Sequence, residues 1–119
     1  MAIKEILIDI LSEFGYPVLL QGSMNENEEY PESFFTFWNN DSYDGDHFDN
    51  DAISAIWDFD VNFYSKDPVL VNSKLLEAKE ALKNQGFIIT GRGYDVASDD
   101  PSWTGRGMHV LKIELIGGN

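Results

Sequence analysis

The sequence predicts an α+β domain in which two helices pack on one face of a mostly antiparallel sheet. A long central stretch alternates apolar and polar residues at the period of a strand. Two other stretches carry apolar residues at helical spacing, and polar turns separate most of the elements. With 119 residues, the chain is expected to form one domain over residues 1–119.

Two helices are predicted. Residues 2–14 carry apolar side chains at intervals of three and four, and Gly15 follows where a helix commonly ends. The second helix begins after Asp67 with Pro68 at its first position, and it ends before Gly86. Its apolar stripe consists of Val71, Leu75, Ala78 and Leu82. Each helix therefore offers one stripe to a sheet.

The longest predicted β feature is a hairpin between Ser33 and Lys66. Alternate residues of its second arm are apolar and form a predicted core face: Ile53, Ala55, Trp57, Phe59, Val61 and Phe63. The residues between them are mostly polar and form a face for water or a polar partner: Ser54, Asp58, Asp60 and Asn62. Such an arm spans roughly 40 Å, whereas a compact chain of this size has a radius of gyration of about 13 to 14 Å. We therefore expect it to bend, bulge or reach a neighbouring molecule.

Shorter strands complete the predicted sheet. Residues 16–21 form an apolar run whose proline places it at a strand start or an edge, and residues 22–32 form an acidic loop. After the second helix, residues 87–90 and 108–116 are predicted to pair as a last hairpin.

Composition excludes several functions. The net charge is −13, with 21 acidic and 8 basic residues, so a nucleic acid would be repelled and sequence-specific DNA binding is not expected. The absence of cysteine removes disulfides, thiolate zinc sites and thiol nucleophiles. No stretch approaches the length of a membrane span, so no membrane partner is expected.

The hairpin loop from Asn40 to Asp51 has a partial likeness to a calcium-binding loop, because Gly45 occupies the sixth place among oxygen donors. Asn stands at the first place, the twelfth is Asp instead of Glu, and the predicted flanks are strands. A solvated turn is therefore favoured over a calcium site.

The tetrapeptide Thr-Gly-Arg-Gly occurs twice, at residues 90–93 and 104–107, and each copy contains one of the two arginines of the chain. A phosphate cradle is disfavoured because no helix N-terminus follows either copy. Two interpretations remain open. Either the two tetrapeptides lie near each other at the mouth of the last hairpin, where glycine allows bulges and twist, or Arg92 and Arg106 dock on an acidic surface of a second copy. His47 and His109 belong to no catalytic pattern, so neither an enzyme nor a cofactor is predicted.

Taken in order, the elements resemble those of a known family. The short N-terminal helix, the strand 33–39, the Asp/Asn/Gly turn, the strand 56–65, the helix ending at 82–87 and the closing Gly-Arg-Gly hairpin follow one another. This succession resembles the tail-terminator (tail-completion) proteins of long-tailed phages and prophages of Gram-positive bacteria.

The resemblance implies an α+β protein that forms a hexameric ring on the tail tube, stops tube growth and provides the head-tail joining surface. Its implied partners are other copies of itself, the tail tube protein and the head-tail connector protein, while DNA passes through the ring. Its implied location is the virion tail, after assembly in the host cytoplasm. No catalytic residues or cofactors follow from the resemblance.

Two groups of residues are expected to serve this role. The subunit interface is expected to use Arg92, Arg106, Asp58, Asp60 and Asn62. An acidic loop is expected to face the lumen or a partner: Asp41, Asp44, Asp46, Asp49 and Asp51. The acidity also fits a small inhibitor, either a DNA mimic or a toxin-immunity protein that binds a basic partner. A metal-dependent enzyme would need calcium or magnesium at the acidic loop.

Overall fold

The computed structural model describes residues 2–23, 29–45, 47–48, 51–52 and 54–115, with the backbone alone described at 47–48 and 51–52. It contains two helices and seven strands, in the order α1 (Ile3–Ser12), β1 (Val18–Leu20), β2 (Ser33–Asp44), β3 (His47–Phe48), β4 (Asp51–Ala52), β5 (Ser54–Ser65), α2 (Pro68–Asn84), β6 (Tyr94–Val96) and β7 (Thr104–Leu115).

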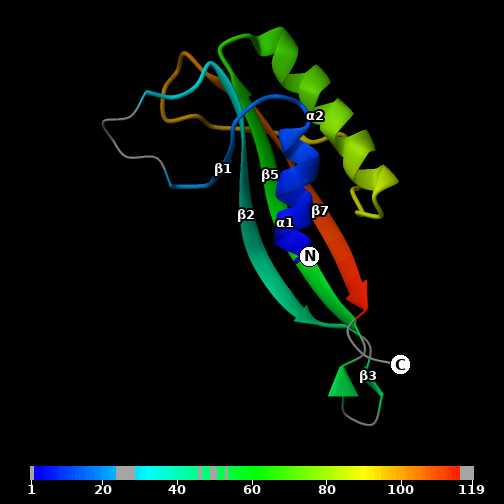
Figure 1. Ribbon diagram of the computed structural model, residues 1–119. Helices are drawn as coiled ribbons and strands as arrows, with labels where there is room; N and C mark the ends of the chain where they lie inside the picture. Colours follow the sequence, from blue (N-terminus) through cyan, green and yellow to red (C-terminus); the bar gives the residue numbers. More distant parts are fainter. Residues whose placement is uncertain (1, 24–28, 46, 49–50, 53, 116–119) are drawn as a thin grey trace.

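Five strands form one sheet in the order β1-β2-β5-β7-β6. β1 runs parallel to β2, and the other neighbours are antiparallel. Both helices lie on one face of this sheet (Figure 1). The predicted α+β architecture, with a mostly antiparallel sheet and two helices on one face, is thereby confirmed.

Both helices begin and end close to the capping residues and glycines from which their bounds were predicted. The Asp67 carboxylate accepts a hydrogen bond of 3.0 Å from the backbone N–H of Val69, and Pro68 is the first helical residue of α2. Gly86 follows the end of α2 and has a φ of 88°, a conformation that glycine adopts without steric cost. The apolar stripes of both helices are buried: Ile3, Leu7, Ile10 and Leu11 in α1, and Val71, Leu75, Ala78 and Leu82 in α2.

The core lies between the helices and the facing sheet surface. The central strand β5 contributes Phe59, Val61 and Phe63, each with 0% exposure. Flanking strands add Phe35 and Phe37 from β2, and Met108 and Val110 from β7. The predicted core face of the second hairpin arm is therefore confirmed at these positions, while Trp57 is half-buried at the margin and Ile53 lies outside the described residues.

The long hairpin is formed by β2 and β5, each of 12 residues. Its register shifts between Asn39 and Asp41, so Asn40 is an extra residue that bulges the strand. The hairpin extends beyond both helices (Figure 1) and gives the molecule extents of 53 × 28 × 22 Å and a radius of gyration of 15.7 Å. Both the bulge and the elongation follow from an arm as long as the domain itself.

The last hairpin differs from the prediction. Residues 87–90 form only one bridge, between Ile88 and Leu111, because glycines with φ of 77° and 89° at positions 91 and 93 then redirect the chain. The partner of β7 beyond that point is β6, which the sequence pattern did not predict. The final strand begins at Thr104 instead of Met108 and includes the second Gly-Arg-Gly.

Candidate interaction surface

The sheet surface opposite the helices, here called the open face, carries the polar side chains of the long hairpin. Trp38 of β2, Asp60 of β5 and His109 of β7 are direct neighbours across these three strands. Residues that alternate with the buried core positions point to this face because successive side chains of a strand alternate. Neither helix covers it (Figure 1).

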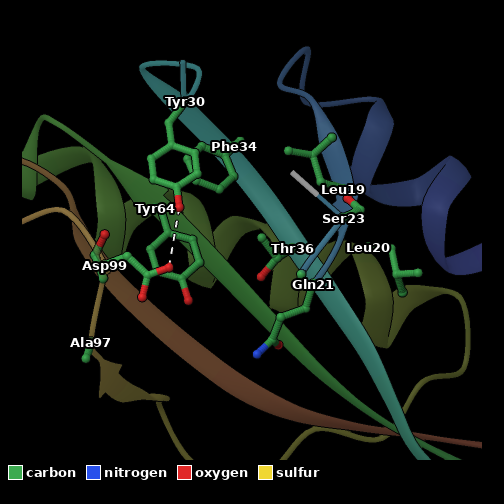
Figure 2. Close-up of a pocket in the computed structure, with 12 residues that line it drawn as sticks. Leu19, Leu20, Gln21, Ser23, Tyr30, Phe34, Thr36, Tyr64, Ala97 and Asp99 are labelled. Atoms are coloured by element: carbon green, nitrogen blue, oxygen red, sulfur yellow. Dashed lines mark hydrogen bonds between the residues drawn. The ribbon is translucent and has the colours of Figure 1, made fainter. Parts of the chain in front are cut away.

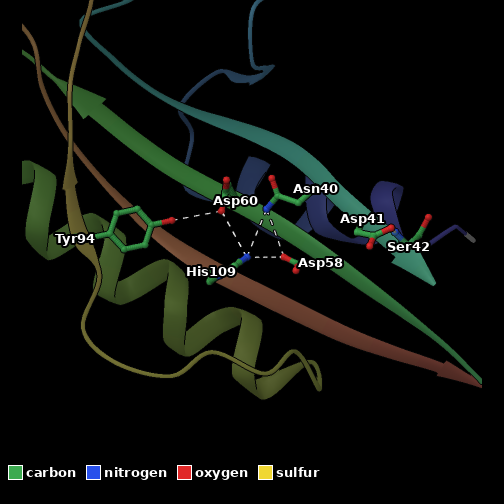
Figure 3. A network of polar contacts seen from close by, with 7 residues as sticks. All are labelled: Asn40, Asp41, Ser42, Asp58, Asp60, Tyr94 and His109. Atoms are coloured by element: carbon green, nitrogen blue, oxygen red, sulfur yellow. Dashed lines mark hydrogen bonds and ion pairs between the residues drawn. The ribbon is translucent and has the colours of Figure 1, made fainter. Parts of the chain in front are cut away.

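Five polar side chains of the open face form a carboxylate cluster, composed of Asn40, Asp58, Asp60, Tyr94 and His109 (Figure 3). His109 Nε2 lies 2.6 Å from Asp58 Oδ1 and 3.8 Å from Asp60 Oδ1. Asn40 Nδ2 lies 3.4 Å from Asp58 Oδ1 and 3.5 Å from His109 Nε2. The Tyr94 hydroxyl donates to Asp60 Oδ1 over 3.4 Å. The cluster therefore joins β2, β5, β6 and β7.

The cluster carries two carboxylates and one imidazole, so it is negative whether or not the imidazole is protonated. Burial raises the pKa of Tyr94, and the charge of Asp60 and the hydrogen bond to it raise that pKa further. The Tyr94 hydroxyl is protonated at neutral pH even at the usual tyrosine pKa, and the raised pKa keeps it a donor into the alkaline range. The Asp58 side chain is 21% exposed and that of His109 57%, so a partner can reach the cluster from solvent.

Aromatic and aliphatic side chains surround the cluster on the open face. Trp38 is 47% exposed. Farther toward the hairpin end, Tyr43, Ile56 and Ile113 form a row across β2, β5 and β7. Exposed aromatic rings beside carboxylates suit a guanidinium group, which stacks on an aromatic face and donates to carboxylate oxygens.

The two Gly-Arg-Gly segments lie side by side, as one of the two open interpretations predicted. Arg106 donates to Asp95 Oδ1 over 2.7 Å and to the carbonyl of Arg92 over 3.0 Å. Its guanidinium is thus engaged within its own chain. The Arg92 side chain is exposed and has no hydrogen bond or ion pair among the described residues.

Gly105 and Gly107 lie in β7 at positions where side chains of the neighbouring strands leave no room for a Cβ atom. A Cβ atom on Gly105 would come within 2.6 Å of the Tyr64 ring, and one on Gly107 within 2.1 Å of Asn62 Oδ1. Asn62 is 5% exposed and donates to Thr36 Oγ1 over 3.4 Å. Of the expected interface residues, Asp58 and Asp60 therefore come together on the surface, while Asn62 is buried beside them.

The acidic hairpin loop is described only in part. Asp41 and Asp44 are exposed in the outer part of β2, and the Asp41 side chain accepts a hydrogen bond from the Ser42 N–H. Asp46 and Asp49 lie outside the described residues, and only the backbone of Asp51 is described, in β4. Across the described portion of the chain, no group of three or more His, Cys, Asp or Glu side chains has an arrangement that could hold a metal ion.

Sequence reasoning missed Asn40, Tyr94 and His109 as members of this surface. Asn40 reaches the cluster through the bulge, and Tyr94 through β6, which has no periodic signal of its own.

Comparison with models of known protein families finds no match, and a search of curated proteins also finds none. Within the described segments, no helix combines the length and apolar character needed to cross a membrane.

Proposed function

We propose that this protein is a structural component of a phage tail that forms a ring at the end of the tail tube, stops tube growth and provides the head-tail joining surface. The observation that supports this most directly is the long β2–β5 hairpin, which projects beyond the helix layer (Figure 1) and carries a sheet face that neither helix covers. The order of elements resembles that of tail terminators.

A contact between Arg92 and the carboxylate cluster would join neighbouring copies. Arg92 lies on the loop before β6, whereas Asp58 and Asp60 lie in the central strand. In the proposed ring this contact is not reciprocated within one pair of copies, which makes it heterologous, and a rotation that closes it produces a ring. Arg92 suits the contact because the other arginine of the chain is already paired with Asp95.

The acidity gives a second part of the proposal. If Asp41 and Asp44 face the lumen, DNA phosphates meet like charge there and pass without adhesive contacts. The ring would bind the tail tube protein on one side and the head-tail connector protein on the other. No catalysis or cofactor is part of this proposal.

Light scattering across a concentration series, followed by negative-stain microscopy with and without purified tail tubes, tests the proposal. Rings of about six copies, free or at tube ends, are the expected result. A protein that stays monomeric and binds no tube end would contradict it.

The net charge of −13 favours a second candidate, a small acidic inhibitor of a basic protein. Such an inhibitor would act as a monomer or dimer and bind its partner with steep salt dependence. Tight binding to a basic nuclease or toxin, without rings, would decide for this candidate.

A further inference from the structure

A pocket lies on the open face at the end of the sheet away from the hairpin turn. It has a volume of about 160 Å³ and lies between the turn after β1, the paired strands β2 and β5, and the loop at residues 97–99 (Figure 2). Six of its lining residues are Gln21, Tyr30, Phe34, Thr36, Tyr64 and Asp99.

One wall of the pocket is a column of stacked aromatic rings. The ring centroids of Tyr30 and Phe34 are 5.7 Å apart with an interplanar angle of 29°, and those of Phe34 and Tyr64 are 5.3 Å apart with an angle of 23°. Trp103 packs edge-on against Tyr30 and donates its indole N–H to the Pro31 carbonyl over 2.9 Å. These contacts hold the column in place without a ligand, which lowers the ordering cost of binding.

The polar groups of the pocket favour a cation. The Tyr30 hydroxyl donates to Asp99 Oδ2 over 3.4 Å, which directs both groups to the same side of the pocket (Figure 2). Burial raises the pKa of the Tyr64 hydroxyl, and the negative charge of Asp99 raises it further. Asp99 is the single charged side chain among the described residues that line the pocket, so its charge has no basic counterpart there.

The size of the pocket indicates what kind of cation enters. Pockets for cofactors and drug-sized ligands have volumes of about 300 to 1,000 Å³. At about 160 Å³ this one is smaller, and it is of a size to take one inserted side chain. A guanidinium group is planar, stacks on aromatic rings and donates several hydrogen bonds to carboxylate and hydroxyl oxygens.

We propose that this pocket binds an arginine side chain presented by a partner protein, with the guanidinium lying against the aromatic column and donating to the Asp99 carboxylate. The net charge of −13 attracts basic partners toward the surface, and the pocket gives one arginine a specific place. This site is separate from the carboxylate cluster, and it does not depend on ring formation.

The test uses the full chain and the small molecule N-acetyl-arginine methylamide, observed by NMR through the tyrosine ring signals. We expect saturable shifts at Tyr30 and Tyr64, with a dissociation constant below about 50 mM. The citrulline analogue, which has nearly the same shape without the charge, should bind at least about tenfold more weakly. The lysine analogue should be intermediate because an ammonium does not stack as a plane.

The variant Asp99→Asn removes the charge from the pocket, and Asp9→Asn removes the same charge from an exposed position on α1. The first should weaken arginine binding at least about tenfold and the second should leave it unchanged. Equal binding of the arginine and citrulline analogues by the unmodified protein would overturn the proposal, as would equal weakening by both variants. Absence of saturable shifts would overturn it as well. Rings that form normally while these shifts are absent would reject the pocket and leave the proposed function standing.

Discussion

The imidazole Nε2 of His109 lies 2.6 Å from the Oδ1 atom of Asp58, and it joins β7 to β5 across the open face. The same imidazole lies 3.8 Å from Asp60, so one basic ring faces two carboxylates (Figure 3). Because Asn40 and Tyr94 also contact these carboxylates, the acidic groups are positioned before any partner arrives. A preorganised cluster loses less conformational entropy when it binds.

The paired substitution Asp58→Asn with Asp60→Asn should weaken self-association by at least about tenfold, because the charges proposed to meet Arg92 are removed. Sedimentation or light scattering at moderate salt would measure this effect. The matched control, Asp9→Asn with Glu13→Gln, removes two charges from exposed positions on and just after α1. Equal association of both double variants would remove the cluster from the interface.

The two arginines should separate assembly from stability. Arg92→Glu should change the free energy of unfolding by less than about 0.5 kcal/mol, because the side chain is exposed, while it blocks ring formation. Arg106→Glu should lower that free energy by about 1 to 2 kcal/mol, because it places a carboxylate opposite Asp95. Urea denaturation and light scattering on both variants give the comparison. Intact rings from Arg92→Glu would contradict the proposed contact.

Trp57→Ala should lower the free energy of unfolding by about 3 kcal/mol. Its ring stacks on Phe59, with centroids 6.3 Å apart, and its indole N–H donates to Glu114 Oε1 over 3.2 Å. Trp38→Ala is the control, because Trp38 lies on the open face with 47% exposure, and a loss below about 1 kcal/mol is expected. Equal losses in chemical denaturation would show that Trp57 is not anchored to the core.

Gly105→Ala should destabilise the fold by about 1 to 3 kcal/mol, because the added methyl group overlaps packed side chains. The new Cβ would come within 2.6 Å of the Tyr64 ring and 2.8 Å of Val96. Thr104→Ala, at the exposed neighbouring position, should change stability by less than about 0.5 kcal/mol. A thermal melt that leaves Gly105→Ala unchanged would mean that Tyr64 is free to move aside.

Tyrosine ionisation should lower stability at alkaline pH. Burial raises the folded-state pKa of Tyr64 and Tyr94 above the usual 10.0, so the unfolded chain loses these protons first. Their contribution is therefore complete below about pH 10 and is lost as the pH rises through the folded-state pKa. Absorbance of tyrosinate near 295 nm should show a late-ionising group that Tyr94→Phe removes. The variant has one tyrosine fewer, so its total absorbance change will be smaller. If the missing part of that change lies at the usual tyrosine pKa and not at higher pH, the prediction is contradicted.

The two helices, the long hairpin and the side of β5 that enters the core can all be predicted from the sequence. These features depend on local patterns. Apolar spacing defines the stripes of α1 and α2, Asp67-Pro68 and Gly86 mark the ends of α2, and alternation along β5 separates Phe59 and Val61 from Asp58 and Asp60. Asp58 and Asp60 could be expected to share a face for the same reason.

Which distant residues meet depends on the way the strands pair in the folded chain. The bulge at Asn40 and the pairing of Asp60 with His109 bring the carboxylate cluster together, and neither follows from a local pattern. The pairing of β6 with β7 likewise places Asp95 opposite Arg106. Cross-strand register depends on contacts between residues far apart in the sequence. A local pattern can predict the face of a strand, but it cannot say which neighbour lies opposite.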